Sequence, residues 1–277
     1  MIGLTPERIT EELQQFHAKL AQGVKTLRDL GEIETGVSLR DPVYQEDKLT
    51  LYRYQPRVEQ PHPVPLLIVY ALVNRPYMMD LQEDRSMIRG LLDAGLDIYL
   101  IDWGYPDAED RHLTLADYIQ RYIHHCVDHL RERHGLDAIN LLGVCQGGAL
   151  SLCFAALYPE KIRNLITMVT PVDFHTPDNM LTHLIRYVDV DLLVDTLGNL
   201  PGQMLNFAFV SLSPFRLAGQ KYVDVMDILD DAQALKNFLR MEKWIYDSPD
   251  QAGEAFRQFA KDFFQQNRLI KGEVIIG

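Results

Sequence analysis

The chain has 277 residues, of which 47% are hydrophobic and 24% charged, and it carries a formal net charge of −12 at pH 7. This length and composition are typical of a globular protein with one large domain, or with one domain that contains an inserted cap. The net charge argues against a nucleic-acid-binding protein, because contacts with phosphates need clustered Lys and Arg. It does not exclude a small anionic substrate, for which a local basic patch is enough.

Targeting and disulfide signals are missing from the sequence. The first residues hold no charged segment followed by an apolar core, so we expect no signal peptide. No apolar run approaches the length of a transmembrane helix. The cysteines Cys126, Cys145 and Cys153 are odd in number and do not resemble a disulfide framework. We therefore expect a cytoplasmic protein.

Residues 1–42 are predicted to form a helical arm. Apolar side chains recur at helical spacing over residues 5–31, with a helix start at Thr5 and Pro6. Residues 43–54 are rich in β-branched and aromatic side chains with imperfect alternation, which favours an exposed strand.

From residue 65 onward, strands are predicted to alternate with helices. Apolar runs predict strands at the following residues: 66–73, 97–103, 138–144 and 164–170. Helices are predicted between them, at 87–95, 114–134 and 149–157. A continuous apolar run is expected of a strand that is covered on both faces. The alternation predicts an α/β fold with a doubly wound, mostly parallel sheet, and we assign residues 43–173 to this core.

The alternation stops after Pro171. Residues 174–246 hold helical patches at 181–197 and 230–244, where an α/β-hydrolase fold carries an inserted helical cap. Residues 247–277 would then return to the core, with an amphipathic helix over 250–269. A plain helical core explains the same pattern. The cap would supply apolar walls for a site, and the candidates are Leu192, Leu193, Leu197, Met204, Phe207, Phe209 and Phe215.

One stretch carries a signature of covalent chemistry, Gly143-Val144-Cys145-Gln146-Gly147-Gly148. It joins an apolar strand to a helix of small residues, which is the sequence form of a nucleophile elbow. A Cβ at Gly143 or Gly147 would collide with the neighbouring strand or helix, and Gly148 completes the set of elbow glycines. We expect Cys145 to be the nucleophile, since a thiol at a helix N-terminus is readily activated. The alternative is that Cys145 is a small buried side chain in an ordinary turn.

An oxyanion hole is expected beside Cys145. One donor in this fold is the backbone N–H of the residue after the nucleophile, which is Gln146 here. The other donor comes from the loop after the preceding central strand, near Val73. Two preset donors stabilise a developing oxyanion by several kcal/mol.

A catalytic base is harder to find. The fold places the triad acid and His on strands that follow the elbow. His175 and His183 are the last histidines, and both lie at the start of the expected cap. Only one strand is predicted after the elbow. We therefore expect the last sheet strands, with the triad Asp and His, to be missing from this chain.

Other candidate residues have structural explanations that we favour. His125 and His129 are one helical turn apart but lack the Glu of a His-Glu-x-x-His motif, so we expect a solvated helix face and no metal. Asp102 and Asp107 follow a predicted strand, where loop capping is at least as good an explanation as ligand binding. The cysteines other than Cys145 are predicted to be packing residues.

The elbow stretch resembles the lipase-like box of polyhydroxyalkanoate synthases, in which Cys replaces the Ser of lipases. Further stretches resemble the class III catalytic subunit of that family, at residues 69–77, 102–106, 110–114 and 244–249. The resemblance covers nearly the whole chain from about Val43 onward. The combination of stretches is far more specific than the box alone.

The resemblance implies an acyltransferase that loads the acyl group of an (R)-3-hydroxyacyl-CoA, expected to be 3-hydroxybutyryl-CoA, onto Cys145 and extends a polyester by repeated transfer. It implies no cofactor, since CoA is only the leaving group, and it makes the backbone N–H groups of Val73 and Gln146 the oxyanion donors. A complex with a second, non-catalytic subunit at the surface of polymer granules is also implied, and a homo-oligomer is compatible with it. In that family the base His lies downstream of a segment that matches residues 272–277, so we expect the chain alone to be inactive.

Two alternatives remain open. A cysteine hydrolase of the dienelactone hydrolase or thioesterase type shares the fold and the elbow, and it would release a free acid instead of a polymer. A non-catalytic module that binds the granule or the partner subunit would not need the Cys145 thiol at all.

Overall fold

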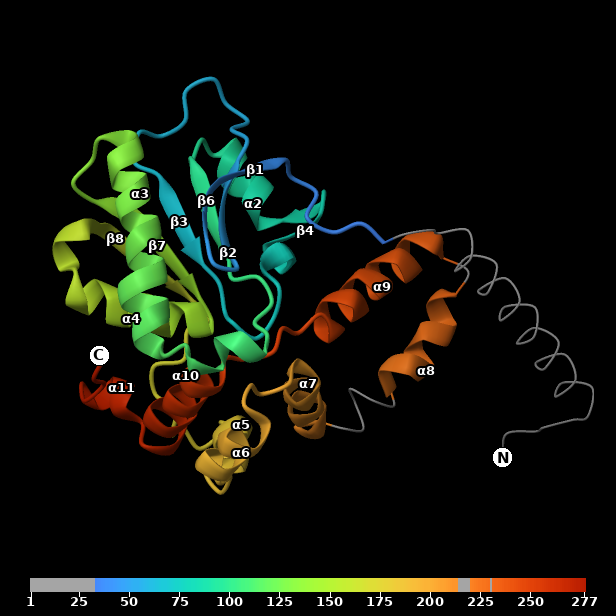
Figure 1. Cartoon of the computed structure of the whole chain (residues 1–277). Helices are drawn as coiled ribbons and strands as arrows, with labels where there is room; N and C mark the ends of the chain where they lie inside the picture. The colour runs from blue at the N-terminus through green and yellow to red at the C-terminus, as the bar shows by residue number, and fades with distance from the viewer. Residues whose placement is uncertain (1–32, 214–219, 230) are drawn as a thin grey trace, which may run out of the picture.

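The computed structural model describes residues 33–213, 220–229 and 231–277. Figure 1 shows a sheet flanked by helices, with further helices below the sheet and to one side. The helix predicted for residues 5–31 and the side chain of Phe215 lie outside the described residues. The arm predicted for residues 1–42 is too long, because its last residues already belong to the first strand.

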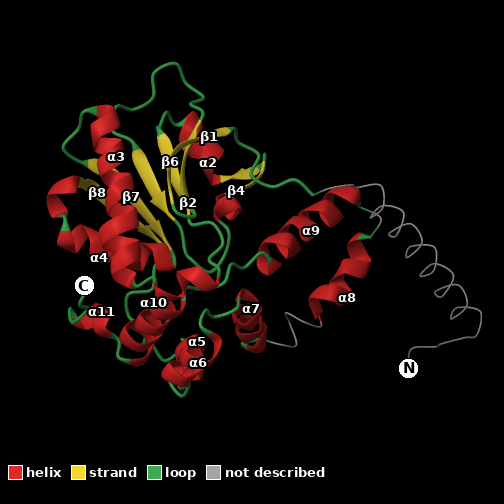
Figure 2. Cartoon of the chain, viewed as in Figure 1, coloured by secondary structure: helices red, strands yellow, loops and turns green. Residues whose placement is uncertain are grey.

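Among the described residues, six strands form one sheet in the order β1-β2-β6-β3-β7-β8 (Figure 2). The pairs β6–β3, β3–β7 and β7–β8 are parallel, whereas β1 and β2 join antiparallel at one edge. The mostly parallel α/β sheet predicted from the alternation is therefore confirmed. The strands are β1 (Arg40–Glu46), β2 (Leu49–Tyr54), β3 (Leu66–Val69), β6 (Ile98–Asp102), β7 (Ile139–Val144) and β8 (Ile162–Met168).

Helices lie between the strands as predicted. The helix predicted for residues 114–134 begins as a π-helix and continues as an α-helix. Short elements between β3 and α2 were not predicted, because each is only a few residues long. The elements of this part are η1 (Pro76–Met79), β4 (Asp80–Gln82), β5 (Arg85–Ser86), α2 (Met87–Asp93), η2 (Ala108–His112), η3 (Asp117–Ile123), α3 (His124–His134), α4 (Gln146–Leu157) and η4 (Pro159–Lys161).

The two faces of the sheet pack against different helices. Leu67 and Val69 of β3 point to the face covered by α3 and α4, where they join the larger hydrophobic core. Leu66 and Ile68 alternate with them and point to the face covered by α2. All four side chains are at most 3% exposed. Coverage of both faces explains why β3 appears in the sequence as a continuous apolar run.

The single strand predicted for residues 43–54 is wrong, because this segment folds as an antiparallel hairpin. β1 and β2 pair in register up to Glu46 and Leu49, which face each other next to the turn. Asp47 in this turn adopts a left-handed conformation with φ 49°, which Asp tolerates better than most residues. The turn contains neither Gly nor Pro, the usual sequence markers of a chain reversal.

The regular elements described within residues 174–246 are helices joined by turns, and they lie at the end of the sheet to which the parallel strands point (Figure 1). The patch predicted for residues 181–197 is two helices, because the Asp189 side chain accepts a hydrogen bond from the N–H of Leu192 and starts a new helix. The helix over residues 202–211 was not predicted. The helices are α5 (Met180–Ile185), α6 (Val190–Leu197), α7 (Gly202–Ser211), α8 (Lys221–Val225), η6 (Met226–Ile228) and α9 (Ala232–Tyr246).

The return to the core is also more broken than the single helix predicted for residues 250–269. It consists of α10 (Gly253–Gln258), a π-helical stretch η7 (Phe259–Gln265) and α11 (Arg268–Lys271). Asn267 has φ 53° and separates the last two elements. In the described part of the chain, no helix is both long and apolar enough to cross a membrane.

Candidate active site

Cys145 occupies a sharp turn between β7 and α4. β7 ends at Val144, α4 begins at Gln146, and Cys145 between them has φ 55° and ψ −125°. A residue other than Gly in such a conformation costs about 1–3 kcal/mol and persists only where its surroundings enforce it. Here the N–H of Cys145 donates to Met168 O on the neighbouring strand, at 2.9 Å. The strained turn is the geometry expected of a nucleophile elbow.

The three elbow glycines are needed for close backbone packing. A Cβ on Gly143 would lie 2.5 Å from the Cα of Gly148, inside α4. A Cβ on Gly147 would overlap the carbonyl oxygen of Val69, at the end of β3, and a Cβ on Gly148 would overlap the side chain of Thr170. The helix therefore approaches the sheet as closely as it does only because these side chains are absent.

Cys145, Gln146 and Val73 all lie on the wall of one large cavity of about 670 Å³. The sequence distributes these residues over two loops, and the parallel pairing of β3 with β7 brings the two loops together. The rest of the wall is mainly aliphatic and aromatic. Such a cavity matches the size and apolar character of a small-molecule site.

The cavity walls come partly from residues that the sequence reasoning named and partly from others. Leu193, Met204 and Phe209 line the cavity as expected. Other expected wall residues point to solvent, and their exposed fractions are 64% for Leu192, 43% for Leu197 and 75% for Phe207. The residues that were missed include Ile185, Val188, Val190, Leu200, Leu205, Phe256, Phe259 and Phe264.

The missed aromatic residues had a detectable signal. Phe256 and Phe259 are three positions apart on the return segment, so they share one face of a helix. The expected walls were sought only within residues 174–246, whereas the structure closes the cavity with the return segment as well.

Two backbone N–H groups, those of Gln146 and Val73, belong to residues on the cavity wall that contains Cys145. Gln146 is the first residue of α4, so its N–H has no acceptor within the helix. In the preceding loop, the N–H of Leu72 donates to the Gln146 side chain at 3.1 Å. The next N–H along, that of Val73, has no acceptor among the described residues. These are the two N–H groups predicted as oxyanion donors.

The Cys145 thiol is partly buried, and this burial has an electrostatic consequence. Burial raises the pKa of the Cys145 thiol, and the nearby N–H of Gln146 opposes part of that increase. A buried anion is disfavoured unless a cation or several donors compensate it. At neutral pH the thiol therefore holds its proton more strongly than an exposed cysteine does.

A base for this thiol is absent from the described residues. None of the described histidines lines the cavity that contains Cys145. His175 is the first histidine after Cys145 in the sequence, and its Nε2 pairs with the carbonyl oxygen of Phe264 at 2.8 Å. The Nε2 of His183 pairs with the carbonyl oxygen of Pro177 at 3.2 Å. Both imidazole rings are therefore engaged in hydrogen bonds with backbone carbonyl groups.

Alkylation of Cys145 by iodoacetamide should keep accelerating with pH after a small reference thiol has levelled off. The thiolate is the reacting species, and the raised pKa of Cys145 moves its formation to higher pH. Cys153 should react more slowly, because burial raises the pKa of its thiol to about 11. Mass spectrometry of labelled peptides over a pH series measures both rates. A Cys145 rate that levels off before the reference would reveal a cationic partner and contradict the account.

Two histidines of α3 pair with carboxylates. His125 Nδ1 pairs with Glu46 at 2.8 Å, and His124 Nε2 pairs with Asp128 at 3.2 Å. The Nε2 of His129 is buried and has no hydrogen-bond partner among the described residues. No group of three or more potential ligands for a metal ion occurs within the described ranges.

Asp102 and Asp107 have structural partners. Asp102 accepts from Arg75 Nη2 at 2.8 Å and from the N–H of Gly104 at 3.0 Å, so it fixes the loop after β6. Asp107 starts η2 by accepting from the N–H of Glu109. Both match the capping explanation that the sequence favoured.

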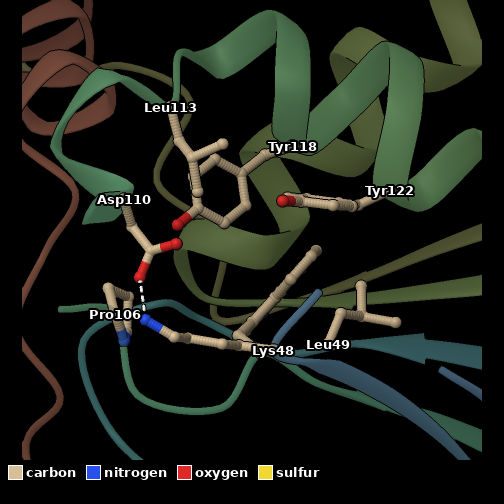
Figure 3. Close-up of a pocket in the computed structure, with 8 residues that line it drawn as sticks. Lys48, Leu49, Pro106, Asp110, Leu113, Tyr118 and Tyr122 are labelled. Atoms are coloured by element: carbon tan, nitrogen blue, oxygen red, sulfur yellow. Dashed lines mark hydrogen bonds and ion pairs between the residues drawn. The ribbon is translucent and has the colours of Figure 1, made fainter. Parts of the chain in front are cut away.

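A second hollow in this region is far too small for a substrate. Figure 3 shows Lys48 paired with Asp110 below Tyr118. The space beside them is about 10 Å³, which is room for about one water molecule. This small space lies next to the turn between β1 and β2, and Cys145 does not line it.

Comparison with known proteins identifies the family. The profile of the alpha/beta hydrolase fold matches residues 64–270, and that of the poly-beta-hydroxybutyrate polymerase (PhaC) N-terminus matches residues 7–91. A protein of Allochromatium vinosum called poly(3-hydroxyalkanoate) polymerase subunit PhaC is 61% identical over 100% of this chain and 78% of its own length. This chain belongs to the PhaC family. The resemblance from residue 43 onward is confirmed, and the family match extends into the N-terminal residues.

Two further relatives bear the same name. The protein of Thiocystis violacea is 59% identical over 100% of this chain and 78% of its own length. The protein of Synechocystis sp. is 56% identical over 98% of this chain and 74% of its own length. The PhaC family consists of polymerases, so membership makes the chain part of an enzyme family.

Proposed function

We propose that this chain carries out acyl transfer in polyester synthesis, in which the acyl group of an (R)-3-hydroxyacyl-CoA passes to Cys145 and then to a growing poly(3-hydroxyalkanoate) chain. One observation carries the proposal: Cys145 lies at a strained elbow on the wall of an apolar cavity that Val73 and Gln146 also line. The names of the relatives support polymerisation of 3-hydroxyalkanoates.

In the first step, the Cys145 thiolate attacks the thioester carbonyl. A bond forms between Sγ and the carbonyl carbon, and the carbonyl oxygen takes up the negative charge. The N–H groups of Val73 and Gln146 stabilise this oxyanion. Loss of one such donor typically lowers the rate about 10²–10³-fold. The bond to the CoA sulfur then breaks, and CoA leaves with the proton that the thiol has lost.

In the second step, the 3-hydroxyl group of another acyl unit attacks the Cys145 thioester. The new ester bond forms as the bond to Sγ breaks, and the hydroxyl proton returns to the cysteine. The apolar cavity walls suit the acyl part of the substrate, and we propose a short acyl chain, that of 3-hydroxybutyryl-CoA. The reaction needs no cofactor.

We propose that the 277-residue chain alone turns over slowly, which replaces the complete inactivity expected from the resemblance. The thiol pKa is raised by burial, and the described residues supply no histidine to the cavity. General base catalysis typically contributes about 10²–10⁴-fold, so CoA release should fall short of a PhaC relative by a factor of that order. A colorimetric thiol assay with 3-hydroxybutyryl-CoA measures both proteins. Turnover equal to that of the relative would contradict the proposed lack of a base.

The product distinguishes the proposal from a hydrolase of the same fold. A polymerase yields insoluble polyester from 3-hydroxybutyryl-CoA, whereas a hydrolase yields soluble 3-hydroxybutyric acid. Acid as the sole product would favour the hydrolase. A pure binding module would release no CoA, and Cys145→Ala would then leave granule or partner binding intact.

We also propose that the protein works in the cytoplasm, at the surface of polyester granules. There it would form a complex with a second, non-catalytic synthase subunit, and self-association into a homo-oligomer is compatible with this complex. Exposed apolar side chains in the helical region after β8 support contact with an apolar surface, among them Tyr187 between α5 and α6 at 83% and Phe207 on α7 at 75% exposure. Co-sedimentation with polyester granules tests this placement.

A further inference from the structure

Two segments that are far apart in the sequence lie along each other beside the cavity. One is the loop after β3, residues 72–77, which carries the proposed oxyanion donor Val73. The other is residues 244–251, which comprise the end of α9 and the segment that follows it. Four side-chain hydrogen bonds join them: Trp244 Nε1 to Arg75 O at 2.8 Å, Tyr77 OH to Asp247 Oδ2 at 3.0 Å, Asn74 Nδ2 to Ser248 Oγ at 3.0 Å, and Gln251 Nε2 to Leu72 O at 2.8 Å.

The bond from Gln251 acts on the peptide that carries the Val73 N–H. The carbonyl of Leu72 and the N–H of Val73 belong to one planar trans peptide unit, so they point in opposite directions. A donor that holds Leu72 O therefore also sets the direction of the Val73 N–H. Gln251 is 4% exposed, and a buried carbonyl that loses its donor is free to turn toward another one.

A second hydrogen bond fixes Leu72 through its own N–H group. Its N–H donates to Gln146 Oε1 at 3.1 Å, and the Gln146 side chain is attached to the elbow itself. Gln251 is in turn fixed by two backbone hydrogen bonds with Leu200, at 2.9 and 3.0 Å. The orientation of the Leu72–Val73 peptide thus depends on the elbow and on the segment that leads into α7.

We propose that Gln251 is a positioning residue for the oxyanion hole. It holds the Leu72–Val73 peptide with the N–H of Val73 toward the Cys145 thiol, and it ties this orientation to the helices over the cavity through Leu200. This inference rests on the proposed role of Val73 in acyl transfer. Without the Gln251 donor, the peptide turns and the oxyanion loses one of its two N–H groups.

The test compares two reactions of Cys145 in the whole chain. Acylation by 3-hydroxybutyryl-CoA passes through an oxyanion, whereas alkylation by iodoacetamide does not. Gln251→Met keeps the length of the side chain and removes the donor. It should lower the ratio of the acylation rate to the alkylation rate about tenfold or more, the order expected for a lost oxyanion donor, and leave alkylation close to wild type. An unchanged ratio would overturn the inference.

Gln120→Met is the matched control. Gln120 also donates a long-range hydrogen bond, from Nε2 to Ile276 O at 3.0 Å, but it does not line the cavity. This variant should keep both rates. Gln251→Glu tests the donor directly, because its carboxylate cannot donate to Leu72 O and its protonated form can. The rate ratio of Gln251→Glu should therefore recover at acid pH, and a ratio that stays low there would contradict the role of the donor.

Amide hydrogen exchange gives a readout that does not depend on the proposed function. Peptides that contain Val73 should exchange faster in Gln251→Met than in wild type or Gln120→Met. Equal exchange would overturn the positioning role. Alkylation of wild-type Cys145 without any acylation would contradict the proposed acyl transfer. If the exchange difference is still present in that case, Gln251 positions the loop even though the proposed function is wrong.

Discussion

Cys145→Ala is expected to abolish acyl transfer from 3-hydroxybutyryl-CoA. The proposed reaction forms a bond to Sγ of Cys145, and no other thiol lines the described cavity. Removal of a covalent nucleophile should lower the rate of CoA release by about 10³-fold or more relative to the unmodified chain. The rate is measured under single-turnover conditions at high pH, where the buried thiol ionises.

Cys153→Ala provides the control for that experiment. Cys153 lies on the same helix as the elbow but faces the core against α3, where it is 7% exposed. This variant should release CoA at the rate of the unmodified chain, since it removes a thiol from the same helix without changing the cavity wall. CoA release from Cys145→Ala at the same rate as from Cys153→Ala would disprove the role of Cys145.

Gly147→Ala should destabilise the protein severely. The added Cβ would overlap the carbonyl oxygen of Val69 and lie 2.6 Å from that of Tyr70, both part of the backbone at the end of β3. A backbone cannot move aside as the end of a flexible side chain can, and such overpacking costs about 3 kcal/mol or more. The expected result is a large drop in the midpoint of urea unfolding, or an insoluble protein.

Gly90→Ala gives the matched comparison for Gly147→Ala. Gly90 lies within α2, and nothing is within 4 Å of a Cβ placed there. Because Ala favours a helix over Gly by about 1 kcal/mol, this variant should be slightly more stable than the wild type. If both variants unfold at the wild-type midpoint, α4 does not approach β3 as closely as described.

The elbow and the sheet core could be predicted because both are determined by short stretches of sequence. The apolar runs at β3, β6 and β7 follow directly from burial on two faces. The elbow joins a strand to a helix without a gap, so Cys145 and its glycines could be recognised from six consecutive residues. The position of Val73 followed from the fold, because the loops after parallel neighbouring strands meet at one edge.

Other parts of the site could not be predicted because they depend on tertiary contacts. The hydrogen bond between Gln251 and Leu72 joins residues that are 179 positions apart, and nothing near Gln251 in the sequence indicates its partner. The exposed positions of Leu192, Leu197 and Phe207 depend on how α6 and α7 are rotated about their axes, which hydrophobicity alone did not reveal. The hairpin turn at Asp47 lacked the usual Gly or Pro.

The central claim is that a covalent acyl thioester forms on Cys145. The most direct test is peptide mapping by mass spectrometry after brief incubation with 3-hydroxybutyryl-CoA and an acid quench. We predict that the peptide containing Cys145 gains the mass of one or more 3-hydroxybutyryl units and loses it on treatment with hydroxylamine, as a thioester does. Release of CoA or formation of polyester without any adduct on Cys145 would contradict the account.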